Sequence, residues 1–300
     1  MNFKEELRKK TGQIEAMIQV YLPKEEGYQR TVTEAMHYAV SGGGKRLRPM
    51  LMAETAALFG DTGESLARFM TALECIHTYS VVHDDLPAMD NDDYRRGRKT
   101  THIVYGEGMA VLAGDGLLNY AFETAASAFD YASETAEYQR VARALQILGR
   151  KAGIYGMIGG QCADLRAEEL GEDVTKDMLL YIHEHKTAAL IQAAMMIGAV
   201  LAGADDEAVS QLEKCAYNIG IAFQIQDDIL DVISSLEVLG KPVGSDEKNN
   251  KLTYVSMHGL EESRKQVEEL SREAIVILQS FPRRNLFLEE LVEQLIYREK

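Results

Sequence analysis

Two clusters of aspartate each follow a stretch of strongly apolar, helix-forming sequence. In chain order their members are Asp84, Asp85, Asp90, Asp227, Asp228 and Asp231. A carboxylate that leaves water without a counter-charge costs several kcal/mol, so acids at the ends of apolar helices need cations nearby. Hard oxygen ligands of this kind suit Mg²⁺. The two clusters therefore predict a site for divalent metal ions.

The two clusters differ in their spacing along a helix. Asp227 and Asp231 are four positions apart, so a helix places both carboxylates on one face. Asp84 and Asp90 are six positions apart, and a regular helix would turn them to different faces. Pro87 lies between them, has no backbone N–H and clashes with the preceding helical turn. We therefore expect the helix to end near Pro87, which would let Asp90 swing back toward Asp84.

A single acidic cluster is compatible with acids at a helix end that simply face water. Two clusters of the same type, each after an apolar helix, favour a shared ligand instead. If both clusters bind that ligand, residues 84–231 must belong to one domain. We therefore predict one domain over residues 1–300.

The net charge of −15 argues against nucleic acid or an anionic membrane as a general partner, because both attract basic surfaces. Basic residues are nevertheless concentrated in two stretches, residues 45–48 and 95–99, and the first directly follows a glycine turn at 42–44. Diphosphate groups bind well to Mg²⁺ together with Arg and Lys donors. Two acidic sites and two basic sites therefore suit an enzyme that binds two diphosphate esters, only one of them through metal.

Helical periodicity runs through the chain, and the alternating pattern of strands is absent. The expected helices cover residues 3–20, 29–40, 47–59, 64–84, 107–131, 136–169, 175–203, 207–236, 260–280 and 285–298. We predict an all-α, single-domain bundle of about ten helices around a central cavity. The helices over 175–203 and 207–236 are apolar on nearly all sides, which places them at the centre of the bundle.

The sequence indicates a cytoplasmic protein. The first ten residues are charged and lack the apolar segment of a secretory signal. The longest apolar run, residues 188–204, falls short of the ~20 residues that a membrane-spanning helix needs. The three cysteines show no metal-binding spacing, and we expect buried free thiols in a reducing compartment. They are Cys75, Cys162 and Cys215.

Five motifs, in this order, resemble those of the trans-isoprenyl diphosphate synthases. They read GGGKRLRP, ECIHTYSVVHDDLPAMDNDDYRRG, HKTAALI, FQIQDDILDV and GKPVGSDEKNNKLTY, and together they span roughly residues 30 to 256. The bacterial farnesyl diphosphate synthases look most similar, because the first acidic motif carries two extra residues. The resemblance implies the isoprenoid synthase type of fold and a homodimer.

The resemblance also implies roles for individual residues. Both aspartate clusters would hold Mg²⁺, with Mn²⁺ as an alternative, although direct metal contact by Asp85 and Asp228 is left open. The residues implied for the allylic diphosphate are Arg95, Lys186, Thr187, Gln224, Lys241 and Lys251. Of these, the catalytic group is Lys186, Thr187, Gln224 and Lys241. The residues implied for isopentenyl diphosphate are Lys45, Arg48, His77 and Arg96.

The implied reaction joins isopentenyl diphosphate to dimethylallyl or geranyl diphosphate. Metals and cations stabilise the departing diphosphate, the allylic cation is attacked by the second double bond, and a proton is lost. Tyr79 and Ser80 lie on the helix just before Asp84, and five helical residues span about 7.5 Å. A bulky Tyr79 is expected to stop chain growth at farnesyl diphosphate, a C15 product, with C20 geranylgeranyl diphosphate as the alternative.

Three other functions share some of these features. An all-α metal phosphohydrolase of the HD type would use the His83-Asp84 dyad and His37, but it leaves residues 227–231 without a role. A terpene cyclase usually carries a different second motif. A non-catalytic partner subunit of a longer-chain synthase would be expected to lack one aspartate cluster, and both are intact here.

Overall fold

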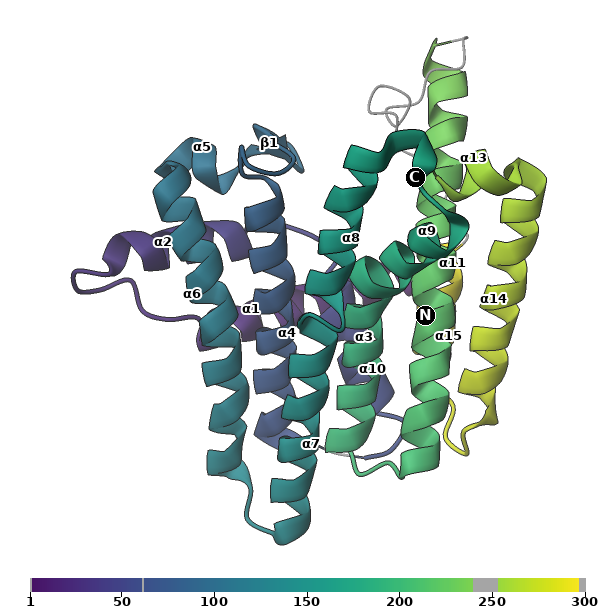
Figure 1. Ribbon diagram of the computed structural model, residues 1–300. Helices are drawn as coiled ribbons and strands as arrows, with labels where there is room; N and C mark the ends of the chain where they lie inside the picture. The colour runs from purple at the N-terminus through teal and green to yellow at the C-terminus, as the bar shows by residue number, and fades with distance from the viewer. Residues whose placement is uncertain (1, 61, 240–252, 297–300) are drawn as a thin grey trace.

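The computed structural model describes residues 2–60, 62–239 and 253–296, and this part of the chain is helical apart from one short hairpin (Figure 1). The prediction of an all-α fold is confirmed. The elements are α1 (Phe3–Tyr21), α2 (Arg30–Val40), α3 (Leu47–Ala56), α4 (Gly63–Asp84), β1 (Tyr94–Arg95), β2 (Arg98–Lys99), α5 (Thr101–Tyr105), α6 (Glu107–Ala126), η1 (Ser127–Tyr131), α7 (Thr135–Ala152), α8 (Met157–Leu170), η2 (Gly171–Asp173), α9 (Lys176–Ile182), η3 (His183–Ala188), α10 (Ala189–Leu201), α11 (Asp206–Leu239), α13 (Tyr254–His258), α14 (Leu260–Ser280) and α15 (Leu286–Ile296).

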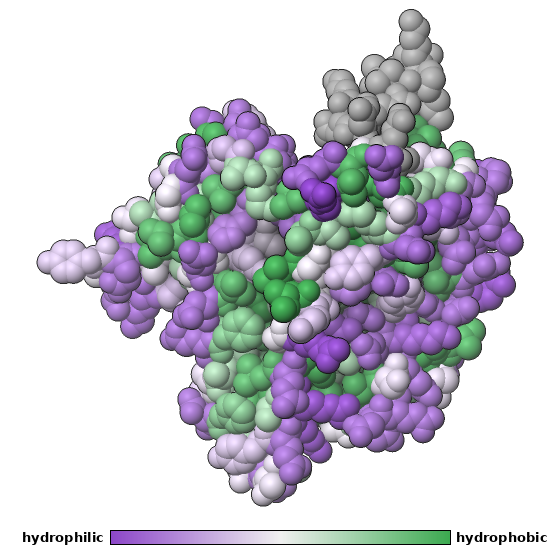
Figure 2. Space-filling model, in the orientation of Figure 1, coloured by the Kyte–Doolittle hydropathy of each residue, from purple (hydrophilic) through white to green (hydrophobic). Residues whose placement is uncertain are grey.

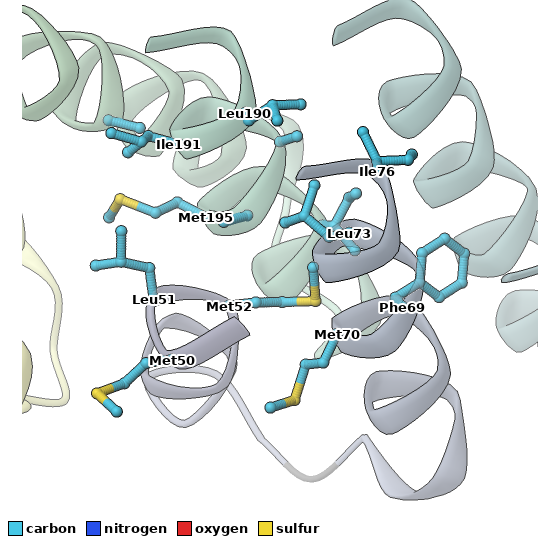
Figure 3. Packing of buried hydrophobic residues seen from close by; sticks show 14 of the residues in the cluster. Met50, Leu51, Met52, Phe69, Met70, Leu73, Ile76, Leu190, Ile191 and Met195 are labelled. Carbon is cyan, nitrogen blue, oxygen red and sulfur yellow. The ribbon is translucent and has the colours of Figure 1, made fainter. Parts of the chain in front are cut away.

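Helix α10 lies at the centre of the bundle, as its apolar sequence predicts. Every one of its residues except Met196 is buried, and the helix packs against α3, α7 and α11. Gly198 permits the approach of α3, because a Cβ at this position would lie 2.3 Å from the carbonyl oxygen of Met52. Figure 3 shows Met195 of α10 facing Met52 of α3 and Leu73 of α4 within the shared core.

The predicted helix over 136–169 is wrong, because the chain forms two helices there. Helix α7 ends at Ala152 and α8 begins at Met157. Between them Gly156 folds tightly against the preceding turn, since a Cβ there would lie 2.0 Å from the carbonyl oxygen of Lys151. The break changes the direction of the chain and places α8 beside η3.

The predicted helix over 175–203 is also wrong in its middle. Residues 183–188, the η3 segment, form a π-helical turn between α9 and α10. A π turn holds one extra residue per turn and is often found at functional sites. Lys186 and Thr187 lie in this turn.

The hairpin of β1 and β2 was not predicted. Arg96 and Gly97 form its turn with positive φ angles of 53° and 75°, a conformation that usually selects Asn or Gly at both positions. The hairpin is fastened to the glycine turn after α2, because Arg98 Nη1 donates to the carbonyl oxygen of Ser41 at 2.7 Å. The hydroxyl of Tyr38 donates to the carbonyl oxygen of Lys99 at the same distance.

Cys75 and Cys215 are buried as expected, whereas Cys162 is exposed, because it lies beside a cavity that α8 lines. Within the described ranges, no helix combines the length and the apolar character that crossing a membrane requires.

Candidate functional site

The first aspartate cluster lies where α4 ends. The helix stops at Asp84, and the chain then turns so that the backbone N–H of Asp90 donates to the carbonyl oxygen of Asp84 at 2.8 Å. The expected return of Asp90 toward Asp84 is confirmed, and Pro87 lies in the turn that produces it. The two residues therefore approach each other although six positions separate them.

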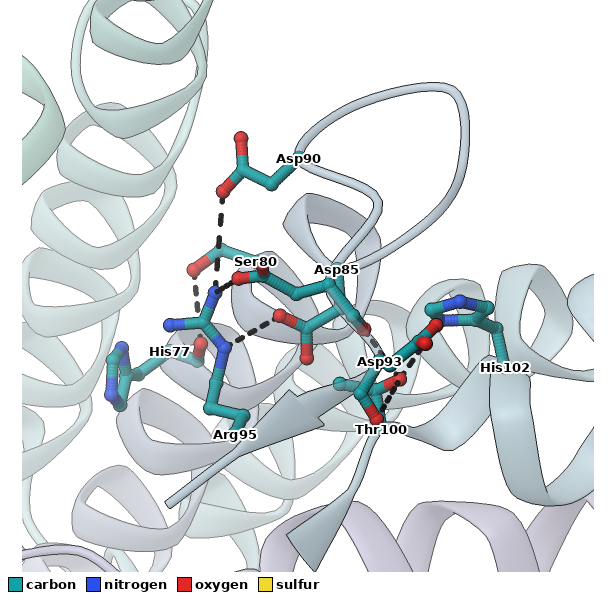
Figure 4. Close-up of polar contacts among 9 residues, drawn as sticks. His77, Ser80, Asp85, Asp90, Asp93, Arg95, Thr100 and His102 are labelled. Atoms are coloured by element: carbon teal, nitrogen blue, oxygen red, sulfur yellow. Dashed lines mark hydrogen bonds and ion pairs between the residues drawn. The ribbon is translucent and has the colours of Figure 1, made fainter. Parts of the chain in front are cut away.

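Arg95 of the hairpin interacts with several carboxylates of the acidic segment that follows α4 (Figure 4). Its Nε donates to Asp85 Oδ1 at 2.5 Å, and its Nη2 donates to Asp92 Oδ2 at 3.2 Å. The same Nη2 lies 4.0 Å from Asp90 Oδ2. Asp85 is only 4% exposed, so its charge needs this partner. Arg95 therefore joins the hairpin to the acidic turn.

Asp84 carries a carboxylate that the protein does not fully compensate. Burial raises the pKa of Asp84 from its ordinary 3.8 to about 6, with Asp90 and Asp164 adding to the rise and Lys186 and Arg95 opposing it. A carboxyl whose ionised form is unfavourable in the free protein attracts a further cation.

The second aspartate cluster lies on α11. Asp228 is 8% exposed and accepts a hydrogen bond from the backbone N–H of Tyr254, the first residue of α13, at 2.8 Å. Asp228 thus supports the start of α13, while Asp227 lines a neighbouring cavity. One turn earlier on α11, Gln224 Oε1 accepts from the hydroxyl of Thr187 at 2.9 Å.

The donor chemistry of the two clusters suits Mg²⁺, which prefers carboxylate oxygens. Among the residues with described positions, no three His, Cys, Asp or Glu side chains are grouped closely enough to enclose a metal ion by themselves. This arrangement fits Mg²⁺ sites in which one or two carboxylates bind the ion, while waters and the phosphate oxygens of a substrate supply the other ligands.

Four predicted residues line one cavity of about 600 Å³, here called the basic cavity. They are Lys45, Arg48, His77 and Arg96. Within the described structure, the buried Nε of Arg48 has no hydrogen-bond partner. Burial, followed by the nearby arginines, holds the pKa of His77 well below its ordinary 6.5, so this imidazole stays neutral beside positive charge. The basic cavity therefore has the charge and the free donor that an anion such as a diphosphate requires.

Arg46 has a different role from the basic residues around it. Its backbone adopts a left-handed conformation with φ of 47°, directly before α3. Its Nη1 donates to Glu74 Oε1 and its Nη2 to the carbonyl oxygen of Val40, both at 2.7 Å. Arg46 and Glu74 are 5% and 3% exposed. The pair neutralises the acid in the wall of the basic cavity and fixes the loop that carries Lys45, a role that sequence reasoning missed.

Glu74→Ala is expected to reduce the free energy of unfolding by about 3 kcal/mol, because it leaves the buried guanidinium of Arg46 without its carboxylate. Urea denaturation measures the change. Glu34→Ala is the matched control, because Glu34 pairs with Arg30 on the surface of α2 and such pairs contribute about 0.5 kcal/mol. Equal losses in the two variants would contradict the assignment.

A second cavity of about 390 Å³ adjoins the first, since Arg48 and His77 line both. We call it the apolar cavity, because its walls include the apolar side chains Met89, Met157, Ile158 and Leu165. The predicted residues that also line it are Tyr79, Ser80, Asp84, Lys186 and Thr187. Tyr79 is 6% exposed, and its hydroxyl has no hydrogen-bond partner in the described part of the chain. A polar group without a partner in an apolar wall is costly, which indicates that the bulk of Tyr79 matters more than its hydroxyl.

Asp164 of α8 is a site residue that sequence reasoning left out. It is 4% exposed, and its Oδ2 accepts from Lys186 Nζ at 2.6 Å. The available signal was an acid in the middle of an otherwise packed helix, but its partner is 22 residues away. Lys241 and Lys251, two further predicted residues, lie outside the described residues.

The structure argues against an HD-type metal phosphohydrolase, because His37, its candidate upstream ligand, has other partners. His37 Nε2 lies 2.7 Å from the carbonyl oxygen of Pro23, and its Nδ1 lies 3.6 Å from Glu25. His83 Nε2 lies 3.2 Å from the carbonyl oxygen of Val111. The two histidines therefore have separate surroundings, and His37 does not complete a dyad with His83 and Asp84.

The comparisons with known proteins agree with one another. The farnesyl diphosphate synthase of Escherichia coli (strain K12) is 44% identical over 278 residues, which cover 91% of each chain. The geranylgeranyl diphosphate synthase of Cyanophora paradoxa is 46% identical over 243 residues, covering 81% of this chain and 79% of the relative. An apo structure of an FPP/GFPP synthase from Zymomonas mobilis has a TM-score of 0.84 at 34% identity and covers 100% of this chain and 99% of that one.

The family comparison extends over most of the chain. The sequence model described as polyprenyl synthetase matches residues 29–281, a range that contains both aspartate clusters and the walls of both cavities except Leu295. The chain belongs to the polyprenyl synthetase family.

Proposed function

We propose that the protein condenses isopentenyl diphosphate with dimethylallyl and then geranyl diphosphate to give farnesyl diphosphate. The observation that carries the proposal is the basic cavity beside the apolar cavity, with Arg48 and His77 lining both. A substrate with a diphosphate head and an apolar tail matches that pair of environments. The residues assigned above to the two substrates line these two cavities wherever the structure describes them, apart from Arg95 and Gln224. Gln224 contacts the lining residue Thr187, and Arg95 contacts Asp85, which directly follows the lining residue Asp84.

The head of isopentenyl diphosphate would bind in the basic cavity. Lys45, Arg48 and Arg96 supply positive charge there, and neutral His77 can donate one further hydrogen bond. Glu74 does not repel the anion, because Arg46 pairs with it. The head of the allylic substrate would lie between the two aspartate clusters, where Arg95 and Lys186 bring positive charge.

Mg²⁺, or alternatively Mn²⁺, would be held by Asp84, Asp90, Asp227 and Asp231. When bound, the metal would stabilise the negative charge that builds on the departing diphosphate. Lys186 reaches the same region and would add a hydrogen bond to that group. The hydroxyl of Thr187 donates to Gln224, and Thr187 lines the apolar cavity, where it would face the reacting carbons.

The chain length of the product is the most specific part of the proposal, since the relatives include both farnesyl and geranylgeranyl diphosphate synthases. Tyr79 lies in the wall of the apolar cavity and supports the C15 product. Tyr79→Ala is expected to shift the main product to C20 or longer, because it opens the cavity along α4. Tyr79→Phe is the matched control, since it removes only the unpartnered hydroxyl and should keep C15. Mass spectrometry measures the chain length of the products. If both variants give only C15, Tyr79 does not limit the length of the product.

One assay tests the proposed function directly. The protein is incubated with Mg²⁺, isopentenyl diphosphate and, in separate reactions, dimethylallyl, geranyl or farnesyl diphosphate. Elongation of the first two to C15 supports the proposal. Elongation of farnesyl diphosphate as well would support the C20 alternative, and no elongation with any acceptor would overturn the proposal.

We also propose a cytoplasmic homodimer. Figure 2 shows apolar residues on the face where α6 and the connection between α7 and α8 lie. The exposed residues there include Val111, Leu112, Ile154 and Tyr155. An apolar face of this kind is typical of a surface that another subunit covers. Light scattering tests the proposal, since a dimer has twice the 33.4 kDa of the chain.

A further inference from the structure

The π turn η3 is the element that aims two predicted site residues. It covers residues 183–188 and interrupts what would otherwise be one helix from α9 to α10. Its extra residue changes the direction of every side chain that follows it. Reverting to a regular helix would rotate Lys186 and Thr187 by about 100° and shift them by about 1.5 Å. Something must therefore hold this turn in its present register.

Two glycines let neighbouring helices approach the turn closely. A Cβ on Gly160 of α8 would lie 2.1 Å from the backbone nitrogen of Lys186. A Cβ on Gly220 of α11 would lie 2.4 Å from the Cβ of Ala188. The turn is thus enclosed between the backbones of α8 and α11, which explains its position but not its register.

Three side chains of the turn make polar contacts with these same helices. Lys186 reaches Asp164 on α8, and Thr187 reaches Gln224 on α11. Glu184 is the third, because its Oε1 accepts a hydrogen bond from the hydroxyl of Tyr217 on α11 at 2.6 Å. Glu184 precedes Lys186 by two residues and neither it nor Tyr217 lines the basic or the apolar cavity.

The contact between Glu184 and Tyr217 is well suited to a structural role. Both side chains are half-buried, so water competes only partly for the hydrogen bond. Burial, followed by the hydrogen bond to Glu184, raises the pKa of Tyr217, so the phenol remains a donor at neutral pH. Hydrogen bonds to a charged acceptor are stronger than those between neutral groups.

We propose that Glu184 and Tyr217 form a positioning pair, whose hydrogen bond fixes the π register that aims Lys186 and Thr187 at the substrates. The proposal rests on the proposed function, because it assigns the pair to the condensation reaction. Lys186 and Thr187 themselves also have partners, but both residues line the apolar cavity, where substrate would bind. The bond between Glu184 and Tyr217 lies outside the cavities and can persist throughout the reaction.

The test compares Tyr217→Phe with a matched control. Tyr217→Phe keeps the ring and removes the donor, and it is expected to lower kcat about 10-fold while the KM for isopentenyl diphosphate changes less than about 2-fold. Tyr21→Phe is the control, because the hydroxyl of Tyr21 also donates to a carboxylate, that of Glu64, but far from both cavities. It should leave kcat unchanged.

Two further measurements separate positioning from a general loss of stability. Glu184→Gln keeps an acceptor oxygen and should retain more activity than Glu184→Ala. Amide hydrogen exchange needs no substrate, and it should become faster over residues 183–188 in Tyr217→Phe and stay unchanged in Tyr21→Phe.

Failure of the positioning pair and failure of the proposed function would give different results. Unchanged kcat and unchanged exchange in Tyr217→Phe would overturn the positioning pair, as would an equal loss of kcat in Tyr21→Phe. If the wild-type protein elongates no allylic diphosphate, the proposed function fails. Exchange over residues 183–188 would still report whether the pair holds the register.

Discussion

Asp84→Asn is expected to lower turnover by about 1,000-fold and, at the same time, to stabilise the metal-free protein. The loss of turnover follows from the proposed metal site, because an amide is a far weaker ligand for Mg²⁺ than a carboxylate. Asp227→Asn should cause a loss of similar size, since the second cluster would hold the same diphosphate from its other side. Steady-state kinetics at saturating Mg²⁺ measure both losses.

The gain in stability follows from the raised pKa of Asp84. Between 3.8 and about 6 the folded protein binds more protons at this carboxyl than the unfolded chain does. Stability therefore falls as pH rises through that window, and above about 6 the ionised carboxylate carries its full cost. Replacing it by Asn is expected to add about 2 kcal/mol at pH 8. The gain should shrink toward pH 4, where Asp84 is already protonated.

Urea denaturation in EDTA at the two pH values measures this effect. Asp93→Asn is the matched control, because Asp93 follows the same acidic turn but is exposed. It should change neither turnover nor stability. An Asp84→Asn variant that is inactive but no more stable at pH 8 would contradict the account of an uncompensated carboxylate. A variant that retains turnover would contradict the metal assignment.

The sequence predicts the parts of the site that depend on local chemistry. Pro87 cannot continue α4, so the sequence allows Asp90 to return toward Asp84, and the structure shows that it does. Asp227 and Asp231 are four positions apart, so the helical repeat places them on one face of α11. The basic stretch at residues 45–48 is identified as well, and the family resemblance selects Lys45 and Arg48 from it, but it gives no partner for Arg46.

The rest of the site depends on tertiary contacts between distant segments. Arg46 differs from Arg48 only because Glu74 lies opposite it on α4. Asp164 becomes a site residue only because the π turn brings Lys186 to α8. Apolar periodicity does not reveal this turn, because α10 is apolar on nearly all sides and a rotation of about 100° leaves its pattern almost unchanged.

The unpredicted hairpin has a similar explanation. Its turn has positive φ angles at Arg96 and Gly97, but Arg in place of Asn conceals the usual signal. Its conformation is maintained by contacts with Ser41, at the end of α2, and with Tyr38 on α2 itself. The hairpin matters because it presents Arg95 to the acidic turn and Arg96 to the basic cavity.

Arg48→Ala is expected to raise the KM for isopentenyl diphosphate about 100-fold. Arg48 lines the basic cavity, and its buried Nε lacks a partner in the described structure. Arg48→Lys keeps the charge but loses the planar pair of donors, so its KM should rise only about 10-fold. Initial rates at varied isopentenyl diphosphate, with the allylic substrate saturating, measure both changes.

Arg264→Ala is the control, because Arg264 is exposed on α14, where it pairs with Glu261 at 3.5 Å, and it lines neither cavity. Its KM should equal that of the wild-type protein. The pH dependence gives a second check, since neutral His77 predicts that this KM does not improve between pH 8 and pH 6.5. A protonated His77 would strengthen anion binding as pH falls. An Arg48→Ala variant with unchanged KM would show that the second diphosphate does not bind in the basic cavity, because a bound anion there would lose a charged donor.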